Sequence, residues 1–269
     1  MSNVRATLNF SVDNGRPIDY YLYEPDPEVE RNPPGTDPKE VEIRDGWPNA
    51  EKFSVDREGF EIKPFKTGFS DFDDDDRIKT AFYPDVVTFV KQQTGAKRAL
   101  VFDHTIRRRL PDDLSQQTEV KRPAVQLVHG DYTTKSGPQR VRDILPNEAE
   151  DLLQGRVAFY NVWKPLFETV EELPLACCDA QSHAADDMLV MELKYRERTG
   201  EIYVMRHSAD HRWWYFPRMT PEQALLLKTY DSATDGRARF MGHTAFEDPN
   251  TPPNALKRQS IEIRTMAFF

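Results

Sequence analysis

The sequence has only two cysteines among 269 residues, Cys177 and Cys178, and because they are adjacent they cannot cross-link distant segments. It has no apolar run near the roughly 20 residues that a membrane-spanning helix needs. Its first ten residues also lack the apolar core of a secretory signal. These absences exclude a disulfide scaffold and a protein with membrane-spanning helices. We therefore expect a cytoplasmic protein that keeps its thiols reduced and contacts no membrane.

Acidic residues outnumber basic residues in this chain. Lys and Arg total 36 and Asp and Glu total 45, which gives a net charge of −9 at pH 7. Nucleic acid is therefore not expected as a partner, because phosphate binding depends on clustered Lys and Arg. The run Arg107-Arg108-Arg109 is short, and we interpret it as a solvated loop rather than as an anion site.

The length fits one large domain or two small ones, and a hydrophobic fraction of 38% is enough for a core of ordinary size; we expect one compact domain. Residues 1–70 are rich in proline and acidic residues around the short candidate strands 6–12 and 19–23. This composition predicts an irregular N-terminal covering layer. Residues 71–269 are expected to form a helical segment followed by the core of the protein.

A cluster of aspartates at 71–76 opens this second part. A calcium-binding EF-hand loop starting there is excluded, because its sixth and twelfth positions need Gly and Glu but hold Asp76 and Phe82. We interpret the acidic residues as the first turn of a helix, where carboxylates face the positive end of the helix dipole. The helix is expected to restart at Pro84 and to end at Gly95.

The rest of the chain is dominated by alternating, β-branched and aromatic segments that are typical of strands. Strands are expected near 98–104, 124–131, 156–163, 187–196, 201–208, 211–217, 239–246 and 259–266. Helices are expected at 137–145, 147–154 and 221–230, the last with Thr220 as its N-cap and Pro221 at its first position. The predicted fold class is mainly β with flanking helices, built on a double-stranded β-helix, the cupin-like jelly roll.

One histidine of the six begins a His-x-Asp tripeptide, His129-Gly130-Asp131. Residues two apart on a strand point to the same face, so Val125, Leu127, His129 and Asp131 share one side. An apolar stripe thus leads to an imidazole and a carboxylate. If that face is the interior of the barrel, two metal ligands are aimed at one point.

A third ligand is expected from another strand, and His243 is best placed because it lies near the end of the predicted strand array. Two histidines and one carboxylate form the facial triad of non-haem Fe(II) oxygenases, which leaves coordination positions open for substrates. We therefore predict that His129, Asp131 and His243 are metal ligands and form the catalytic centre.

The last predicted strand carries a second candidate feature, since Arg258, Ser260, Glu262 and Arg264 alternate with isoleucines. One interpretation leaves this polar face in water. The other places Arg258 and Ser260 inside the barrel, where a guanidinium and a hydroxyl bind the distal carboxylate of 2-oxoglutarate.

These features together resemble a known family, the Fe(II)/2-oxoglutarate-dependent oxygenases of secondary metabolism that are often described as hydroxylase/desaturase proteins. That family includes a component of cephamycin methoxylase and the fungal gibberellin desaturase. The resemblance rests on VFDHTIR (101–107), VHGDYT (128–133), NVWKPL (161–166), PLACCD (174–179), WYFPRM (214–219), KTYDS (228–232), HTAFEDP (243–249) and RQSIEIR (258–264). Two departures, Lys164 in place of Arg and Cys177 in place of a larger apolar residue, concern the substrate pocket.

The resemblance implies an enzyme that uses Fe(II), 2-oxoglutarate and O₂ to hydroxylate or desaturate an unactivated C–H of a small biosynthetic metabolite, releasing succinate and CO₂. A homodimer is a possible assembly. Two alternatives stay open: a cupin-like metalloenzyme that does not use 2-oxoglutarate, and a catalytically silent jelly-roll partner of an oxygenase complex.

Three further residues are candidates near this site. Asn161 is interpreted either as a ligand of 2-oxoglutarate or as a buried amide that satisfies the backbone, and Trp163 either as a pocket wall or as core. Tyr132 is a candidate substrate contact because it follows Asp131.

The remaining histidines and the cysteines are given structural roles. His104 is expected to make a structural hydrogen bond, and His183 to lie in a loop. His207 and His211 are expected at a surface or edge, with a rival metal site at Asp210 as the alternative. Cys177 and Cys178 are expected to be buried as small apolar groups.

Overall fold

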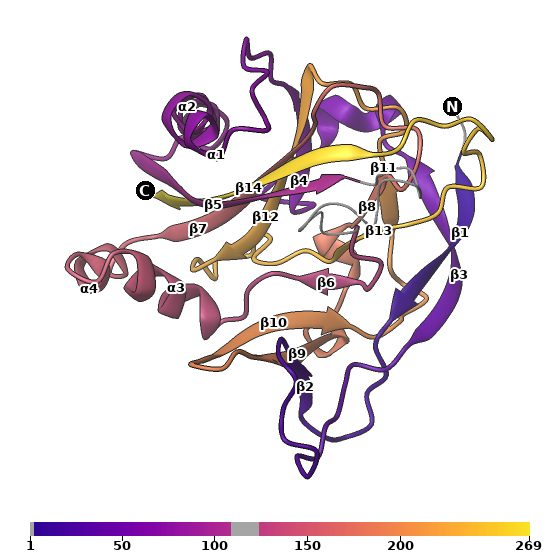
Figure 1. Cartoon of the computed structure of the whole chain (residues 1–269), viewed down its shortest axis with the longest axis vertical. Coiled ribbons are helices and arrows are strands. Elements are labelled where there is room, and N and C mark those ends of the chain that lie inside the picture. Colours follow the sequence, from indigo (N-terminus) through magenta and orange to yellow (C-terminus); the bar gives the residue numbers. More distant parts are fainter. Residues whose placement is uncertain (1–2, 109–123) are drawn as a thin grey trace.

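The computed structural model describes residues 3–108 and 124–269, and within these ranges the chain forms two sheets. The larger sheet has nine strands and the smaller has five. In spatial order the larger sheet contains β1 (Val4–Phe10), β3 (Asp37–Asp45), β11 (Trp213–Tyr215), β8 (Leu175–Cys178), β13 (His243–Ala245), β6 (His129–Gly130), β10 (Thr199–Met205), β9 (Met188–Lys194) and β2 (Ile18–Tyr21). Figure 1 shows its N-terminal strands at one side of the molecule.

The smaller sheet lies against the larger one and contains, in order, β4 (Phe60–Pro64), β12 (Gln223–Asp231), β7 (Val157–Pro165), β14 (Gln259–Phe268) and β5 (Arg98–Arg108). Its inward side chains Trp163 and Leu227 share one buried cluster with Leu175 and Cys177 of the larger sheet. Two sheets packed around such a cluster form the predicted double-stranded β-helix, which is confirmed by close fold neighbours.

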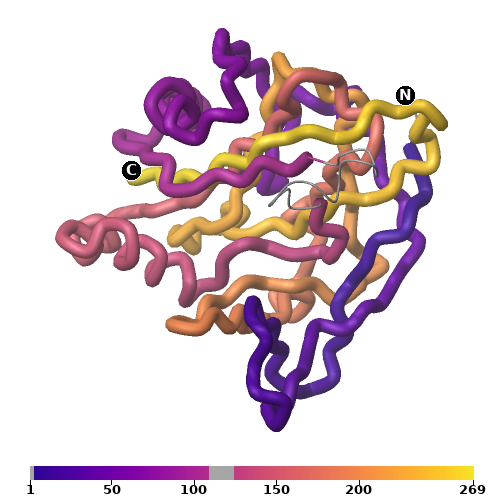
Figure 2. The backbone as a smooth tube through the Cα atoms, viewed as in Figure 1, coloured from indigo at the N-terminus to yellow at the C-terminus, as the bar shows by residue number. Residues whose placement is uncertain are grey.

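A helical segment covers the outer face of the smaller sheet (Figures 1 and 2). It consists of α1 (Asp75–Arg77), a π-helical turn (Ile78–Phe82) and α2 (Tyr83–Thr94). The Asp74 side chain accepts a hydrogen bond from the backbone N–H of Arg77 at 3.0 Å, and Gly95 ends α2 with a φ of 73°. The expected acidic start and glycine end are therefore confirmed.

Two shorter helices, α3 (Ser136–Ile144) and α4 (Ala149–Leu152), lie where helices are predicted at 137–145 and 147–154. Val141 and Ala149 from these helices share a buried cluster with Phe159, Tyr230 and Met266. The helices thus close one end of the barrel, next to the strand that carries His129.

The first 64 residues contribute strands to both sheets. β1 pairs with β3, β3 runs parallel to β11, and β2 runs parallel to β9. The division of the chain into 1–70 and 71–269 stays a prediction. Strands β3, β4 and β8 are absent from the predicted elements because they are bounded by prolines or are very short.

The predicted helix at 221–230 is wrong, because Gln223–Asp231 is strand β12. Its side chains are buried on both faces: Leu225 and Leu227 point into the barrel while Leu226 packs beneath α2. A strand buried on both faces has no polar alternation, so a run of leucines after a proline resembles a helix start. The backbone N–H of Thr220 donates to the Gln223 side chain in a turn instead of capping a helix.

Two other expectations about strands are corrected. The predicted strand 124–131 is reduced to His129–Gly130, with an isolated bridge between Leu127 and Asn9. Arg107 and Arg108 belong to β5 and not to a solvated loop, while Arg109 lies outside the described residues. None of the helices in the described ranges has both the length and the apolar character needed to cross a bilayer.

Leu226 of β12 gives a test of this correction, because its fully buried side chain packs between the smaller sheet and α2. We expect Leu226→Ala to lower the free energy of unfolding by about 2–5 kcal/mol. Leu256→Ala is the matched control: Leu256 is 50% exposed, so its truncation should change stability by less than about 0.5 kcal/mol. Urea unfolding followed by circular dichroism measures both, and equal losses would contradict the assigned packing.

Candidate metal centre

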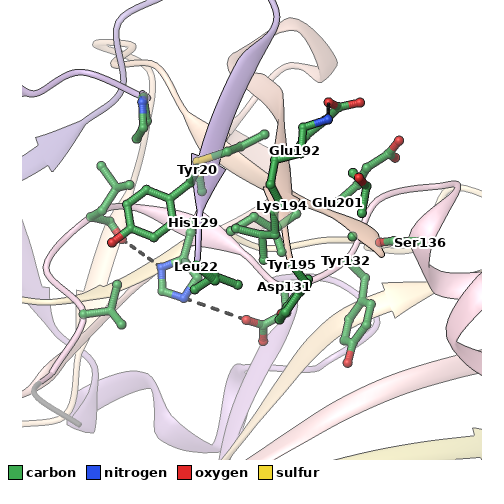
Figure 3. A pocket seen from close by; sticks show the side chains of 18 of the residues that line it. Tyr20, Leu22, His129, Asp131, Tyr132, Ser136, Glu192, Lys194, Tyr195 and Glu201 are labelled. Atoms are coloured by element: carbon green, nitrogen blue, oxygen red, sulfur yellow. Dashed lines mark hydrogen bonds and ion pairs between the residues drawn. The ribbon is translucent and has the colours of Figure 1, made fainter. Parts of the chain in front are cut away.

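His129 and Asp131 lie at the end of β6 with their side chains facing each other (Figure 3). The Nδ1 atom of His129 is 2.8 Å from the carbonyl oxygen of Leu127, so the N–H at Nδ1 donates to that carbonyl. This leaves a lone pair on Nε2, which is 3.8 Å from Oδ1 of Asp131. A separation of that size is too long for a hydrogen bond and suits two ligands of one ion.

His243 completes the group from the neighbouring strand. In the pairing of β13 with β6, His243 lies directly opposite His129, and the two ring centroids are 4.5 Å apart. One potential ligand atom from each of His129, Asp131 and His243 lies within 4.8 Å of the others. The structure therefore brings together the three residues that the sequence singled out.

Burial sets the protonation of this group. It lowers the pKa of His129 to about 4, helped by the positive charge of His243, so His129 is neutral near pH 7. Burial acts to raise the pKa of Asp131, but the imidazolium forms of His243 and His129, present in the acidic range where Asp131 titrates, and the charge of Arg264 hold it below its usual range. A neutral imidazole beside a carboxylate is the protonation state that a divalent cation requires.

Asn161, from the facing sheet, contacts this group. Nδ2 of Asn161 donates to Oδ2 of Asp131 at 2.5 Å, so Asn161 touches a candidate ligand. Among the described residues, Oδ1 of Asn161 and Nδ1 of His243 are buried and have no hydrogen-bond partner. Unpaired buried polar atoms around three converging ligands fit a bound metal ion and its small ligands.

Arg264 belongs to a polar network that the sequence analysis did not assign. Its guanidinium donates to Asp103, Thr105 and Glu262, at 3.0, 3.1 and 2.5 Å, on the inner face of the smaller sheet. The alternation of polar residues with isoleucines on the last strand was the available signal, since it places Arg264 on the same face as Arg258. The pairing partner Asp103 could not be found without the register of β5.

Arg258 and Ser260 also lie on the inner face, which rules out the interpretation that leaves this face in water. Ile261 and Ile263 pack beneath α2 on the opposite face, and Arg258 and Ser260 are 5% and 1% exposed. Nη1 of Arg258 donates to the carbonyl oxygen of Leu173 at 2.5 Å, and its guanidinium lies 5.5 Å from the centre of the Trp163 ring. The Oγ atom of Ser260 is buried with no partner among the described residues.

A cavity of about 1060 Å³ opens beside His129 and Asp131. Its wall includes Tyr132, Arg264 and, from the N-terminal segment, Tyr20. Figure 3 shows Tyr20 and Leu22 near His129, with Glu192 and Lys194 on the neighbouring strand β9. Trp163 is not among the described residues that line this cavity; it is 2% exposed and packs in the core.

The other histidines stand apart from this centre. Nδ1 of His104 is 2.7 Å from the Tyr83 hydroxyl, a structural hydrogen bond on the outer face, and His183 lies in a loop. Of the expected surface or edge position, the surface part is wrong for His211, because its side chain is 1% exposed and its Nε2 lies 3.1 Å from Asp187. His211 thus pairs with Asp187 and not with Asp210, and the edge of the sheet is covered there by Phe10.

The fold and the three converging side chains define a jelly-roll protein with a two-histidine, one-carboxylate centre, the arrangement of non-haem iron oxygenases. The family model described as "Oxidoreductase/YMDC permease-like domain" matches residues 8–268. The hydroxylase/desaturase efuI of Hormonema carpetanum is 30% identical over 250 residues, which cover 85% of this chain and 83% of that protein.

One more relative and one solved structure are similar to this chain over nearly its whole length. The Fe(II)/2-oxoglutarate-dependent dioxygenase nvfI of Aspergillus novofumigatus is 28% identical over 256 residues, covering 93% of this chain and 90% of that protein. The solved structure of the iron and alpha-ketoglutarate-dependent endoperoxidase NvfI has a TM-score of 0.90 at 23% identity, with coverage of 99% of this chain and 98% of that one.

This chain belongs to the hydroxylase/desaturase family of Fe(II)/2-oxoglutarate-dependent dioxygenases. The predicted class of enzyme and its predicted Fe(II), 2-oxoglutarate and O₂ are confirmed. A metalloenzyme that does not use 2-oxoglutarate and a silent partner protein are not favoured.

The two cysteines give a test of burial near this centre, because β8 pairs with β13 and Cys177 lies opposite His243. Both thiols are free and buried, and burial raises the pKa of Cys178 to about 12 and that of Cys177 further. Near pH 8, Cys178 should carry roughly a thousandth of the thiolate of an ordinary cysteine. We expect neither thiol of the native protein to react with Ellman's reagent and both to react after unfolding; fast labelling of the native protein would contradict this.

Proposed function

We propose that His129, Asp131 and His243 hold the Fe(II) of this oxygenase. The observation that carries the proposal is the register of β13 against β6, which places the two imidazoles side by side and the carboxylate within reach of both. We propose further that Arg258 and Ser260 bind the distal carboxylate of 2-oxoglutarate. The support is a buried guanidinium on the inner face and a hydroxyl with no partner among the described residues.

Hydrogen bonds from neighbouring residues orient the proposed ligands in the absence of a metal ion. The Leu127 carbonyl fixes the Nδ1–H tautomer of His129, which keeps the Nε2 lone pair pointing toward Asp131. The Asn161 amide holds one oxygen of Asp131, so the other oxygen stays available. Bound Fe(II) and 2-oxoglutarate would, together with O₂, supply the oxidant that removes a hydrogen atom from an unactivated C–H of the substrate.

The substrate is proposed to be a small biosynthetic metabolite that enters the cavity beside His129, with Tyr132 on its wall. Its placement decides between hydroxylation, in which oxygen is returned to the carbon radical, and desaturation, in which a second hydrogen is lost. In this proposal Asn161 orients Asp131 through its hydrogen bond, and the ring of Trp163 packs against the guanidinium of Arg258. The cytoplasmic location and the homodimer stay predictions.

A metal-binding experiment tests the ligand assignment. We expect His129→Ala to weaken Fe(II) binding by at least roughly 100-fold, because one of three ligands is lost. His183→Ala is the matched control, since His183 lies in a loop and its nearest ring contacts are backbone carbonyls. Anaerobic calorimetric titration with Fe(II) measures both variants; unchanged affinity in His129→Ala would remove His129 from the site.

A second experiment tests the cosubstrate assignment. Arg258→Gln should cost about 2–5 kcal/mol of 2-oxoglutarate binding free energy, because it leaves a carboxylate in a buried site without its cation. Arg218→Gln, which removes an exposed arginine paired with Glu171, is the control. Anaerobic titration of the Fe(II)-loaded protein, followed by its visible charge-transfer band, gives both affinities. Equal affinity in the two variants would contradict the role of Arg258.

A further inference from the structure

Arg140 of α3 lies on the wall of the cavity beside the proposed metal ligands. Residues three and four apart share one face of a helix, and in α3 Gly137 and Val141 are both buried against the body of the protein. Arg140 follows Gly137 at this spacing and is half-buried. Its guanidinium lies 5.1 Å from the centre of the Phe102 ring, so packing on an aromatic ring holds it at the cavity wall.

Arg140 differs from most other cations of this wall, which are paired with acids. Those pairs join Lys135 to Glu201, Lys194 to Glu192, and Arg264 to Asp103. None of the hydrogen bonds and ion pairs among the described residues includes Arg140. Arg198 also has no ion pair there, but it is exposed between β9 and β10 and lies over the ring of Tyr195. The half-buried guanidinium of Arg140 therefore has unused N–H donors at the cavity, which an anion can accept.

The cavity wall changes character along the segment that carries the proposed ligands. Before His129 the wall is apolar, since Leu127 lines the cavity and packs in one cluster with Met191, Leu193 and Ile202. After Asp131 the chain continues through Tyr132 into α3, which carries the guanidinium. Figure 3 shows Leu22 near His129, and Tyr132 past Asp131. The proposed ligands thus lie between an apolar region and a cation that line the same cavity.

The charges around Arg140 favour an anion with a single charge. Asp103 and Asp143 line the cavity as well. Asp103 is offset by Arg264, whereas Asp143 is exposed and accepts only the side-chain amide of Gln139 at 2.8 Å. A doubly charged phosphate would be repelled by Asp143 and would have one guanidinium to neutralise it. A carboxylate matches that guanidinium in charge and in its two-pronged hydrogen-bond geometry.

We propose that the substrate is an amphipathic carboxylic acid, whose carboxylate binds Arg140 and whose apolar body lies on the Leu127 side of the cavity. The C–H to be oxidised then lies between these two ends, beside the proposed metal ligands. This inference rests on the proposed function, because it assumes that the cavity beside His129 holds the substrate. A volume of about 1060 Å³ accommodates a molecule of this kind. Arg140 thus selects the substrate and decides which carbon faces the ligands.

The experiment compares two probes of the cavity, octanoate and octan-1-ol, which have the same chain length and differ in charge. The full-length protein is loaded anaerobically with Fe(II) and saturating 2-oxoglutarate, so that octanoate cannot occupy the cosubstrate position. Calorimetry measures the affinity of each probe, and no turnover is needed. Arg140→Gln should weaken octanoate by roughly 10- to 100-fold, because a hydrogen-bonded ion pair is lost, and leave octan-1-ol unchanged. Arg142→Gln is the matched control, because Arg142 lies on the same helix and pairs with Glu150; it should leave both affinities unchanged.

The other outcomes separate this inference from the proposed function. If the native protein binds octanoate no more tightly than octan-1-ol, or if Arg140→Gln leaves octanoate binding unchanged, the inference is wrong. Equal weakening of both probes by Arg140→Gln would indicate a general structural effect and would also overturn it. In each of these cases the proposed function stands if Fe(II) and 2-oxoglutarate still give the visible charge-transfer band; absence of that band in the native protein contradicts the proposed function itself.

A second variant covers the case in which Arg140→Gln does not fold. Arg140→Met removes the charge and keeps an apolar side chain on the Phe102 ring. It should bind octanoate and octan-1-ol with affinities closer to each other than those of the native protein. A preference for octanoate as large as that of the native protein would overturn the role of the guanidinium.

Discussion

The cross-strand pair of His129 and His243 is the constraint on which the rest of the site depends. β13 is three residues long and lies between β6 and β8, so its register decides which side chain faces the barrel. A slip of one residue would turn His243 outward and bring Thr244 into its place. Because burial keeps His129 neutral, two imidazoles can lie side by side next to a carboxylate without the repulsion that two imidazolium ions would suffer.

The apolar layer outside the smaller sheet explains how polar side chains come to be buried inside it. α2 and the π-helical turn cover Ile261 and Ile263, and burial of that face is favourable by the hydrophobic effect. Because successive residues of a strand alternate, the same pairing turns Arg258 and Arg264 inward, where each finds hydrogen-bond partners. The outer packing thus fixes the orientation of a polar face that would otherwise favour water.

Local patterns in the sequence were sufficient to predict some features of this structure. The His129-x-Asp131 spacing and the alternation after Arg258 follow from the period of a strand, and Gly95 follows from the left-handed end of a helix. The β12 strand was mistaken for a helix because both its faces are buried, a property set by the other layers. The inward position of Arg107 and the pairing of His211 with Asp187 depend on register and on distant segments, which local patterns do not contain.

The proposed metal ligands and part of the cavity wall come from different regions of the larger sheet. β2, which ends next to Leu22, pairs with β9 at the edge of the sheet, and β9 and β10 separate it from β6. Tyr20 and Leu22 are about half exposed, at 49% and 50%, so their side chains can change with little effect on packing. A change there alters the shape of the cavity while the register of β6 and β13 stays the same. The edge strand can therefore change in sequence independently of the proposed ligands, whose positions are fixed by strands in the interior of the sheet.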